Sequence, residues 1–301
     1  MVFYHKSGNL SIVGVYAVLL AVWSSTWIAI KVGLHGAPPL VGAGLRFLSA
    51  GLLLAAFRLA CRRPLAVPRP QRRFVAVIAL TLFAIPYGLV YAGETQVTAG
   101  LAAVLWSTVA LFAALYASRL LPDEPLTALK LAGIGAGVCG LVLVFHGGLG
   151  LRTGHLAVLA MLGLLAAPAC GAYGRVIVRR DGPTLPQTVL LAWSMGLAGL
   201  ALLAVALVTE PYHVTLDART LGAIAYLSLI GSVLPFMLLY WLLGKVRAVS
   251  AALIDLSLPL VTLLAGWAFY GEALSVSVVA GAVVVVAGLA LATADARRVH
   301  V

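Results

Sequence analysis

The chain has 301 residues, of which 63% are hydrophobic and only 10% are charged, and its mean hydropathy is +1.10. Soluble domains average about 45–50% apolar and about 25% charged residues, so this composition excludes an ordinary soluble protein. The net charge of +11 comes from 20 Lys and Arg against 9 Asp and Glu. In a membrane protein such basic residues act first as topology signals, so no nucleic-acid partner is needed to explain them.

Apolar runs bounded by charges, Pro or Gly predict ten membrane-spanning helices, each close to the about 20 residues that cross a bilayer. The first half contains five of them, over residues 12–34, 40–60, 74–93, 97–118 and 126–146. The second half contains the other five, over residues 155–178, 186–209, 219–243, 246–269 and 274–293. The sequence therefore predicts an all-α polytopic membrane protein embedded in a lipid bilayer.

The basic residues predict the orientation of these helices. With the N-terminus inside, all Lys and Arg fall at inner loops or inner helix ends except four, which are Lys31, Arg46, Arg152 and Arg219. The positive-inside rule then places both termini in the cytoplasm.

The two halves of the chain repeat each other. Ile85-Pro86-Tyr87 matches Leu234-Pro235-Phe236, 149 residues later, and after a slip of one residue Glu124 matches Glu272. Because five spans are an odd number, the second copy is inverted in the membrane relative to the first. We therefore expect two inverted five-helix repeats, at residues 1–147 and 148–301, with a substrate site where they meet.

Several features follow one another in an order that is typical of one family. A Trp- and Ser-rich stretch ends helix one, a Pro begins helix two, and Ala-rich fourth and ninth helices are each followed by an acidic residue and a Gly-spaced helix. The residues concerned are Trp23-Ser24-Ser25-Thr26-Trp27, Lys31, Pro39, Arg46, Glu124, Gly133, Gly140, Glu272, Gly281 and Gly288. In these features the chain resembles the drug/metabolite transporter superfamily, specifically its EamA family.

Within that family the chain is most similar to the YddG-type exporters of aromatic and other amino acids. One departure is that Pro259 of helix nine has Ala110 as its counterpart in helix four, where the family often carries a proline. The resemblance implies a multi-pass protein of a bacterial inner membrane that exports its substrate from a central cavity.

Asp255 is a charged residue expected deep inside helix nine. It lies about nine residues from the start of that helix, or roughly 14 Å by the helical rise, near the middle of the bilayer. The repeat places Trp106 opposite it. We expect Asp255 to receive a substrate ammonium and Trp106 to offer an apolar or cation–π surface, with Pro259 on the same stripe as Asp255. In the alternative, Asp255 pairs with Arg46 or Lys31, or bonds a neighbouring helix, and contributes only to packing.

Helix one predicts a second part of the site. Lys31 shares one helical face with Trp27 and Trp23, and Ser24 lies one residue off that line. If the face turns inward, Lys31 attracts a substrate carboxylate. In the alternative, Lys31 extends to the nearby outer interface.

Aromatic residues form matching stripes on helices three and eight. Tyr87, Tyr91 and Glu94 follow one face of helix three, and Phe236 and Tyr240 answer on helix eight. Such walls suit an apolar or aromatic side chain, although packing in the core or at the membrane interface explains the same residues.

No catalytic motif, metal-ligand spacing or cofactor fingerprint occurs in the sequence. We therefore expect no enzyme, no metal and no cofactor. The predicted function is secondary export of small metabolites, most of all amino acids, by alternating access, and the sequence is compatible with a monomer. Two alternatives stay open: a multidrug or quaternary-cation exporter, and a transporter of nucleotide sugars or phosphorylated sugars. Coupling to protons, with Asp255 as the candidate, and facilitated transport also stay open.

Overall fold

The computed structural model describes residues 12–97, 99–145, 155–181, 185–211, 214–215, 217–270 and 276–298. Every regular element within these residues is a helix, as predicted. The predictions made for Arg152 and Glu272 lie outside the described residues.

The helices form the ten predicted spans. Those of the first half are α1 (Ile12–Gly33), α2 (Pro39–Ala60), α3 (Arg72–Ile78) continued by η2 (Ala79–Ala84) and α4 (Ile85–Gly93), α5 (Ala99–Ser107) continued by α6 (Val109–Leu120), and α7 (Ala128–Phe145). Those of the second half are α8 (His155–Asp181), α9 (Gln187–Thr209), α10 (Ala218–Ser228) continued by η3 (Leu229–Val233) and α11 (Leu234–Leu243), α12 (Ala248–Tyr270), and α13 (Val276–Arg298). A short 3-10 helix, η1 (Arg69–Gln71), precedes α3. By length and composition six of the described spans suffice to cross a membrane, and four shorter apolar helices accompany them.

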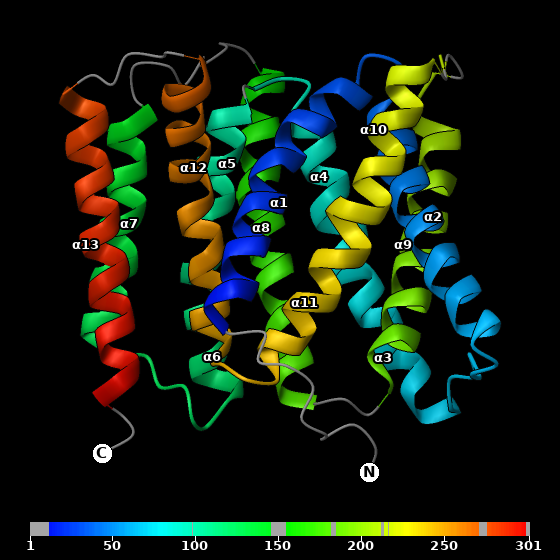
Figure 1. Cartoon of the computed structure of the whole chain (residues 1–301), viewed down its shortest axis with the longest axis horizontal. Coiled ribbons are helices and arrows are strands. Elements are labelled where there is room, and N and C mark those ends of the chain that lie inside the picture. The colour runs from blue at the N-terminus through cyan, green and yellow to red at the C-terminus, as the bar shows by residue number, and fades with distance from the viewer. Residues whose placement is uncertain are drawn as a thin grey trace.

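The spans run alternately up and down between two faces of the bundle. We call the face where α1 begins the Ile12 face and the face where it ends the Gly33 face. α1 begins and α13 ends at the Ile12 face, the lower one in Figure 1. The first span of the second half, α8, begins at the Gly33 face, so the second half is inverted relative to the first, as predicted.

The bundle consists of two lobes that do not coincide with the two halves of the chain. In Figure 1 one lobe contains α5, α6, α7, α12 and α13, and the other contains α2, α3, α9, α10 and α11, with α1, α8 and α4 between them. α7 packs along α13, and α2 packs along α9. Each lobe therefore combines equivalent helices of both repeats. The two repeats are thus interleaved rather than side by side.

Glycines allow these two helix pairs to approach backbone to backbone. A Cβ atom added at Gly199 on α9 would lie 2.4 Å from the Leu48 nitrogen on α2, and one added at Gly288 on α13 would lie 2.5 Å from the Gly133 oxygen on α7. Small residues at helix interfaces are typical of membrane proteins, because van der Waals packing holds such helices together. The glycines of helix five therefore pack within the chain, against α13.

The third and eighth spans are irregular at equivalent places. The π-helical segments η2 and η3 each end just before a proline, Pro86 and Pro235. Proline removes a backbone donor and leaves the carbonyl four residues earlier without its helical partner. In the eighth span this carbonyl, Gly231 O, accepts a hydrogen bond of 2.9 Å from Arg46 Nη2.

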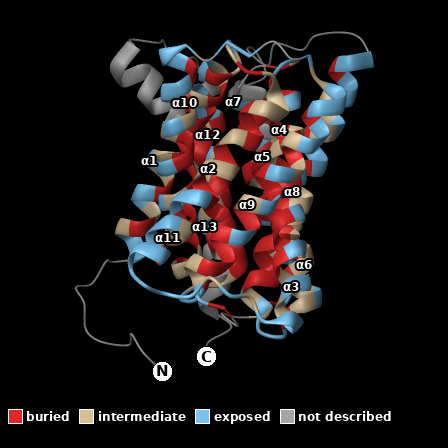
Figure 2. Cartoon of the chain, turned by 90° about the vertical axis from the view of Figure 1, so that its right-hand side faces the viewer, coloured by how far each residue is buried: buried red, intermediate tan, exposed pale blue. Residues whose placement is uncertain are grey.

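Buried residues concentrate along the centre of the bundle (Figure 2). Large apolar side chains also cover its outside, for example Phe57 at 60%, Leu159 at 63% and Val208 at 86% exposure. A broad apolar exterior of this kind fits contact with lipid rather than water.

Candidate substrate-binding site

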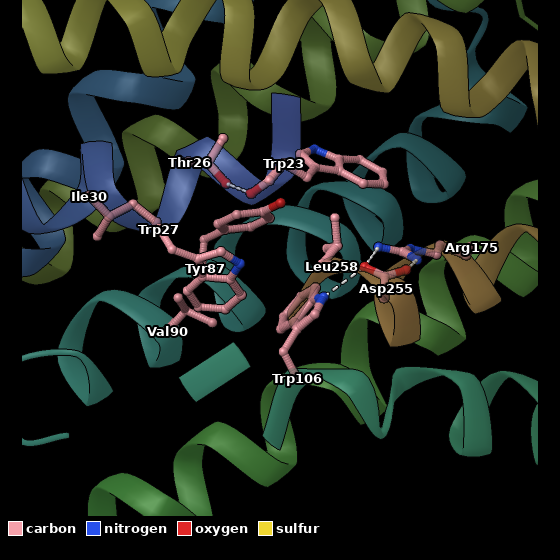
Figure 3. A pocket seen from close by; sticks show the side chains of 10 residues that line it. All are labelled: Trp23, Thr26, Trp27, Ile30, Tyr87, Val90, Trp106, Arg175, Asp255 and Leu258. Atoms are coloured by element: carbon pink, nitrogen blue, oxygen red, sulfur yellow. Dashed lines mark hydrogen bonds and ion pairs between the residues drawn. The ribbon is translucent and has the colours of Figure 1, made fainter. Parts of the chain in front are cut away.

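A small pocket lies at the centre of the bundle, between the two lobes. Its lining comes from five helices, α1, α4, α5, α8 and α12, and consists of Trp23, Thr26, Trp27, Ile30, Tyr87, Val90, Trp106, Arg175, Asp255 and Leu258 (Figure 3). The cavity volume is about 30 Å³. This is room for about one water molecule, so the structure represents a nearly closed conformation.

The polar end of the pocket consists of the Arg175–Asp255 ion pair and the Trp106 indole, which is hydrogen-bonded to it. Asp255 Oδ1 accepts hydrogen bonds from Trp106 Nε1 at 2.8 Å and from Arg175 Nη2 at 3.2 Å, and Arg175 Nη1 donates to Asp255 Oδ2. Arg175 is 3% and Asp255 1% exposed. The two charges therefore cancel inside a buried site, where an unpaired charge would be costly.

Two predictions from the sequence concern Asp255: its position opposite Trp106 and its charged partner. Trp106 and Asp255 are 149 residues apart, the offset of the repeat, and they contact each other as the alignment indicated. Arg46 and Lys31, the ion-pair partners offered in the packing alternative, were wrong, whereas the bond to a neighbouring helix that the same alternative offered is present, to Trp106 and to Arg175. Arg175 had been assigned to the inner helix end of α8.

Small residues on α8 explain why Arg175 reaches the centre. A Cβ atom at Gly174 would lie 3.0 Å from Leu82 Cβ, and one at Gly171 would lie 3.5 Å from the Trp106 ring. α8 therefore packs closely against the third and fourth spans. Arg175 lies six residues before the end of α8, roughly 9 Å into the bundle by the helical rise.

Aromatic rings form the walls of the pocket. The Trp106 ring lies 6.5 Å from Trp27 and 6.0 Å from Tyr87, measured between centroids. Phe236 stands behind this layer, 5.9 Å from Trp23 and 6.3 Å from Tyr87, and does not line the pocket. Offset and edge-to-face contacts of this kind hold the rings in fixed orientations.

Two N–H groups at the polar end have no hydrogen-bond acceptor within the described part of the chain. They are Trp23 Nε1 and Arg175 Nε, and both are buried. The Arg175 guanidinium carbon lies 5.5 Å from the centre of the Trp23 ring, so the two donors belong to adjacent groups. A buried donor without an acceptor costs about 1–3 kcal/mol, and an anionic group of a ligand is the kind of partner that such a donor binds.

The structure brings together Trp23, Trp27, Tyr87, Trp106 and Asp255 of the predicted site residues. The others lie elsewhere. The Ser24 hydroxyl faces Leu258 O at 3.5 Å, and Pro259 follows the pocket residue Leu258 without lining the pocket itself. The remaining three predicted residues lie in two other places.

Lys31 and Tyr91 lie towards the Gly33 face. Lys31 Nζ donates to the backbone oxygens of Glu94 and Val97, the latter at 3.1 Å, so it does not line the pocket but bonds the connection that follows α4. Tyr91 is 2% exposed and packs beside Gly42. Tyr240 lines a separate cavity near the Ile12 face together with Arg179 and Gln187.

Sequence reasoning missed five pocket residues, Thr26, Ile30, Val90, Arg175 and Leu258. Arg175 carried a weak signal, because an Asp predicted at mid-membrane needs a cation; the predicted helix end at residue 178 placed Arg175 in the last turn, whereas the observed helix continues to Asp181. The other four are ordinary apolar or hydroxyl residues, and nothing in the sequence distinguishes them from residues of the core.

The Ile12 face is closed below the pocket by contacts between the two halves. Glu124 accepts hydrogen bonds from the backbone nitrogens of Ala248 at 2.6 Å and Val249 at 3.1 Å, at the start of α12. Arg179 donates to Leu243 O at 3.1 Å and to Asp123 at 3.5 Å. A carboxylate on a helix N-terminus is favourable, because four N–H groups there lack helical partners.

Ten spans in two inverted copies, with a central polar pocket between two lobes, define a polytopic membrane transporter. The sequence model of the EamA-like transporter family matches residues 11–146 and again residues 158–294. The chain therefore belongs to the EamA-like transporter family, and it is a transporter rather than an enzyme.

The names of similar proteins agree with this family assignment. The chain is 32% identical over 269 residues to the "Uncharacterized inner membrane transporter YedA" of Escherichia coli strain K12, with 88% of this chain and 85% of that protein covered. It is 28% identical over 285 residues to a Salmonella typhimurium protein named "Probable amino-acid metabolite efflux pump", with 90% and 91% covered. A solved structure superposes with a TM-score of 0.74 at 19% identity, covering 96% of this chain and all of that one, which concerns the fold alone. The chain is thus a multi-pass inner membrane protein.

Proposed function

We propose that the chain exports amino acids, including aromatic ones, through the central pocket by alternating access. The observation that carries the proposal is the pair of unsatisfied donors at the polar end, Trp23 Nε1 and Arg175 Nε. A substrate carboxylate would accept from both, and Asp255 provides a neighbouring acceptor for the substrate ammonium. The name of the Salmonella relative supports the same class of cargo.

The walls suit the side chain of such a cargo. Rings of Trp27 and Tyr87 face the pocket, and Ile30 and Val90 extend its apolar lining towards the Gly33 face. Apolar and aromatic side chains would be desolvated there at a gain of about 25 cal/mol per Å². A mostly apolar pocket with a few polar groups at one end is typical of small-molecule sites.

Alternating access requires that the pocket enlarge, because about 30 Å³ does not hold an amino acid. We propose that the two lobes rock about α1 and α8, with η2 and η3 as the flexible points in the third and eighth spans. The repeats at 1–147 and 148–301 each contribute to both lobes. The contacts of Arg179 with Asp123 and with Leu243, which belong to different lobes, would then break when the Ile12 face opens, whereas Glu124 would move together with α12.

The proposed orientation in the membrane rests on the distribution of basic residues, and the direction of transport on the proposal of export. The helix ends at the Ile12 face carry Arg58, Arg119, Arg179 and Arg180, and its loops carry further arginines. By the positive-inside rule this face and both termini are cytoplasmic, and export runs towards the Gly33 face. Because the glycine stripes are used within the chain, we propose a monomer.

The site supports the two rival cargo classes less well. The Arg175–Asp255 pair leaves no net charge for a quaternary cation, although the rings around it would suit one. A phosphorylated sugar or nucleotide sugar needs several converging cations. Lys31 is bonded to backbone oxygens, and Arg46 is bonded to Gly231 O and Ser232.

The experiment is counterflow in proteoliposomes. Labelled phenylalanine is exchanged against unlabelled phenylalanine, phenylalaninamide, 3-phenylpropionate, a quaternary-ammonium drug or a sugar phosphate. We expect saturable exchange that phenylalanine inhibits and that the amide, which lacks the carboxylate, inhibits at least about tenfold more weakly. Exchange of the drug or of the sugar phosphate alone, or equal inhibition by amide and acid, would contradict the proposal.

A further inference from the structure

A second buried polar cluster lies between the pocket and the Gly33 face. It consists of Arg46 on α2, Tyr91 on α4 and Glu94 directly after α4, with exposed fractions of 1%, 2% and 1%. Four of its polar atoms have no hydrogen-bond partner in the described part of the chain: Arg46 Nη1, Tyr91 OH, and both carboxylate oxygens of Glu94. Buried polar groups in proteins are nearly always paired, so four such atoms in one cluster need an explanation.

Glu94 is the unusual member of the cluster. It has the only carboxylate among the described residues that is buried with neither oxygen paired, since Glu124 and Asp255 have partners for both. The charged and titratable groups that act on it are Lys31 on α1, Arg46 on α2 and Tyr91 on α4. On α8, the atoms nearest to a Cβ added at the adjacent Gly93 belong to the apolar Leu164.

An ionised carboxylate without hydrogen bonds is costly in such a place, whereas a protonated one is not. Glu94 lies one residue beyond the span that ends at Gly93, and burial raises the pKa of its carboxyl to about 8, although Lys31 and Arg46 act to lower it. The carboxyl can therefore gain and lose a proton in the physiological range.

Arg46 connects this carboxyl to the parts that have to move. Its guanidinium carbon lies 4.8 Å from the centre of the Tyr87 ring, which is a wall of the pocket. Its Nε donates to Ser232 Oγ at 2.8 Å and its Nη2 to Gly231 O at 2.9 Å, both in η3. One guanidinium thus bonds the irregular segment of the eighth span, while its third nitrogen, Nη1, makes no hydrogen bond of normal geometry within the described residues and interacts with the Tyr91 side chain.

We propose that Glu94 is the proton-binding site that couples export to the proton gradient, with Arg46 as the positioning residue that relays its charge to η3 and Tyr87. When Glu94 is ionised, it draws Arg46 Nη1 towards itself and away from η3. When it takes up a proton from the Gly33 face, Arg46 returns to η3. One proton then enters for each cargo molecule that leaves, and it is released when the site next opens to the Ile12 face.

This inference replaces Asp255 as the candidate for proton coupling and rests on the proposed function. Asp255 accepts three hydrogen bonds, two of them from a guanidinium, so both of its oxygens are already paired, whereas neither oxygen of Glu94 is. The role of Asp255 would then be to bind cargo.

The test compares wild type, Glu94→Gln and Asp217→Asn in proteoliposomes whose membrane potential is clamped. Asp217→Asn is the control, since Asp217 is an exposed carboxylate at the same face and Asn preserves its N-cap. We measure phenylalanine counterflow at equal pH and net phenylalanine efflux with the outside about one unit more acidic. A one-to-one exchange converts that gradient into an about tenfold cargo gradient.

The expected result is that wild type and Asp217→Asn build this gradient, whereas Glu94→Gln keeps counterflow and equilibrates without a gradient. Absence of counterflow in wild type would mean that the proposed function fails. Counterflow in wild type with no response to pH, or a Glu94→Gln variant that still builds the gradient, would overturn the coupling proposal alone. If Glu94→Gln does not fold, Glu94→Asp is the second variant. The coupling proposal would likewise be overturned if efflux by Glu94→Asp depended on pH in the same way as efflux by wild type.

Discussion

Replacing Asp255 by Asn separates the electrostatic role of the carboxylate from its size. The amide fills the same volume, so no cavity forms, but Arg175 remains buried at 3% exposure without its counter-charge. Removing one partner of a buried ion pair costs about 3–5 kcal/mol. At the lower figure the melting temperature should fall by roughly 6–12 °C, since a domain of this size shifts by about 2–4 °C per kcal/mol.

The assay is thermal unfolding of the detergent-solubilised protein, followed by size-exclusion chromatography of the heated samples. Arg180→Gln on the same helix is the matched control, because its pair with Asp181 is 41% and 34% exposed. Exposed pairs contribute less than about 1 kcal/mol, so the control should stay close to wild type. The double variant Arg175→Met with Asp255→Leu should recover most of the loss, because an apolar pair leaves no charge unpaired. The reasoning is refuted if Asp255→Asn melts with wild type, or if the double variant loses the sum of the two single changes.

Three further predictions follow from the packing, the caps and the buried carboxyl. Gly199→Ala should destabilise the folded protein by about 1–3 kcal/mol, because the new Cβ would lie 2.4 Å from the Leu48 nitrogen. Gly196→Ala is the control: a Cβ there meets nothing within 4 Å, so its stability should stay unchanged or rise by up to about 1 kcal/mol. Equal melting temperatures of the two variants would contradict this. Glu124→Gln should lower the free energy of unfolding by about 1–3 kcal/mol, because it weakens the two hydrogen bonds to the start of α12. Asp123→Asn should cost little, because Asp123 is 59% exposed. Chemical or thermal unfolding distinguishes the two, and a larger effect at Asp123 would contradict a stabilising role of the Glu124 hydrogen bonds. The pKa of Glu94 is raised from 4.5 to about 8 in the folded protein, so its contribution to stability is fully present below pH 4.5 and is lost as the pH rises to about 8. Glu94→Gln should therefore flatten the pH profile of the melting temperature between these two values. An unchanged slope in the variant would show that another group titrates there.

The fold was largely predictable from the sequence, because in a bilayer the backbone leaves few choices and the apolar runs mark the spans directly. The offset that joins Trp106 to Asp255 identified the centre of the pocket. What the sequence did not contain was the interleaving of the repeats into two lobes. That arrangement depends on which helices approach each other through Gly199 and Gly288, and the packing partner of a small residue is not visible in one chain.

The site was only partly predictable, for a related reason. Ring types and mid-membrane depth indicated Trp23, Trp27 and Tyr87, but the direction in which a side chain points depends on helix rotation. Tyr240 and Lys31 share the composition signals of pocket residues and point elsewhere. Arg175 was hidden by the rule that basic residues near helix ends mark the inner face.

The central claim is that cargo is held by its carboxylate between Trp23 and Arg175. The measurement that tests it most directly is the KM for phenylalanine in proteoliposome counterflow by wild type and Trp23→Phe, which keeps an aromatic ring and removes one N–H donor. A hydrogen bond to a charged group contributes about 1.5–3 kcal/mol, so the KM should rise at least about tenfold, while inhibition by phenylalaninamide should change little. An unchanged KM, or an equal loss of affinity for acid and amide, would contradict the account.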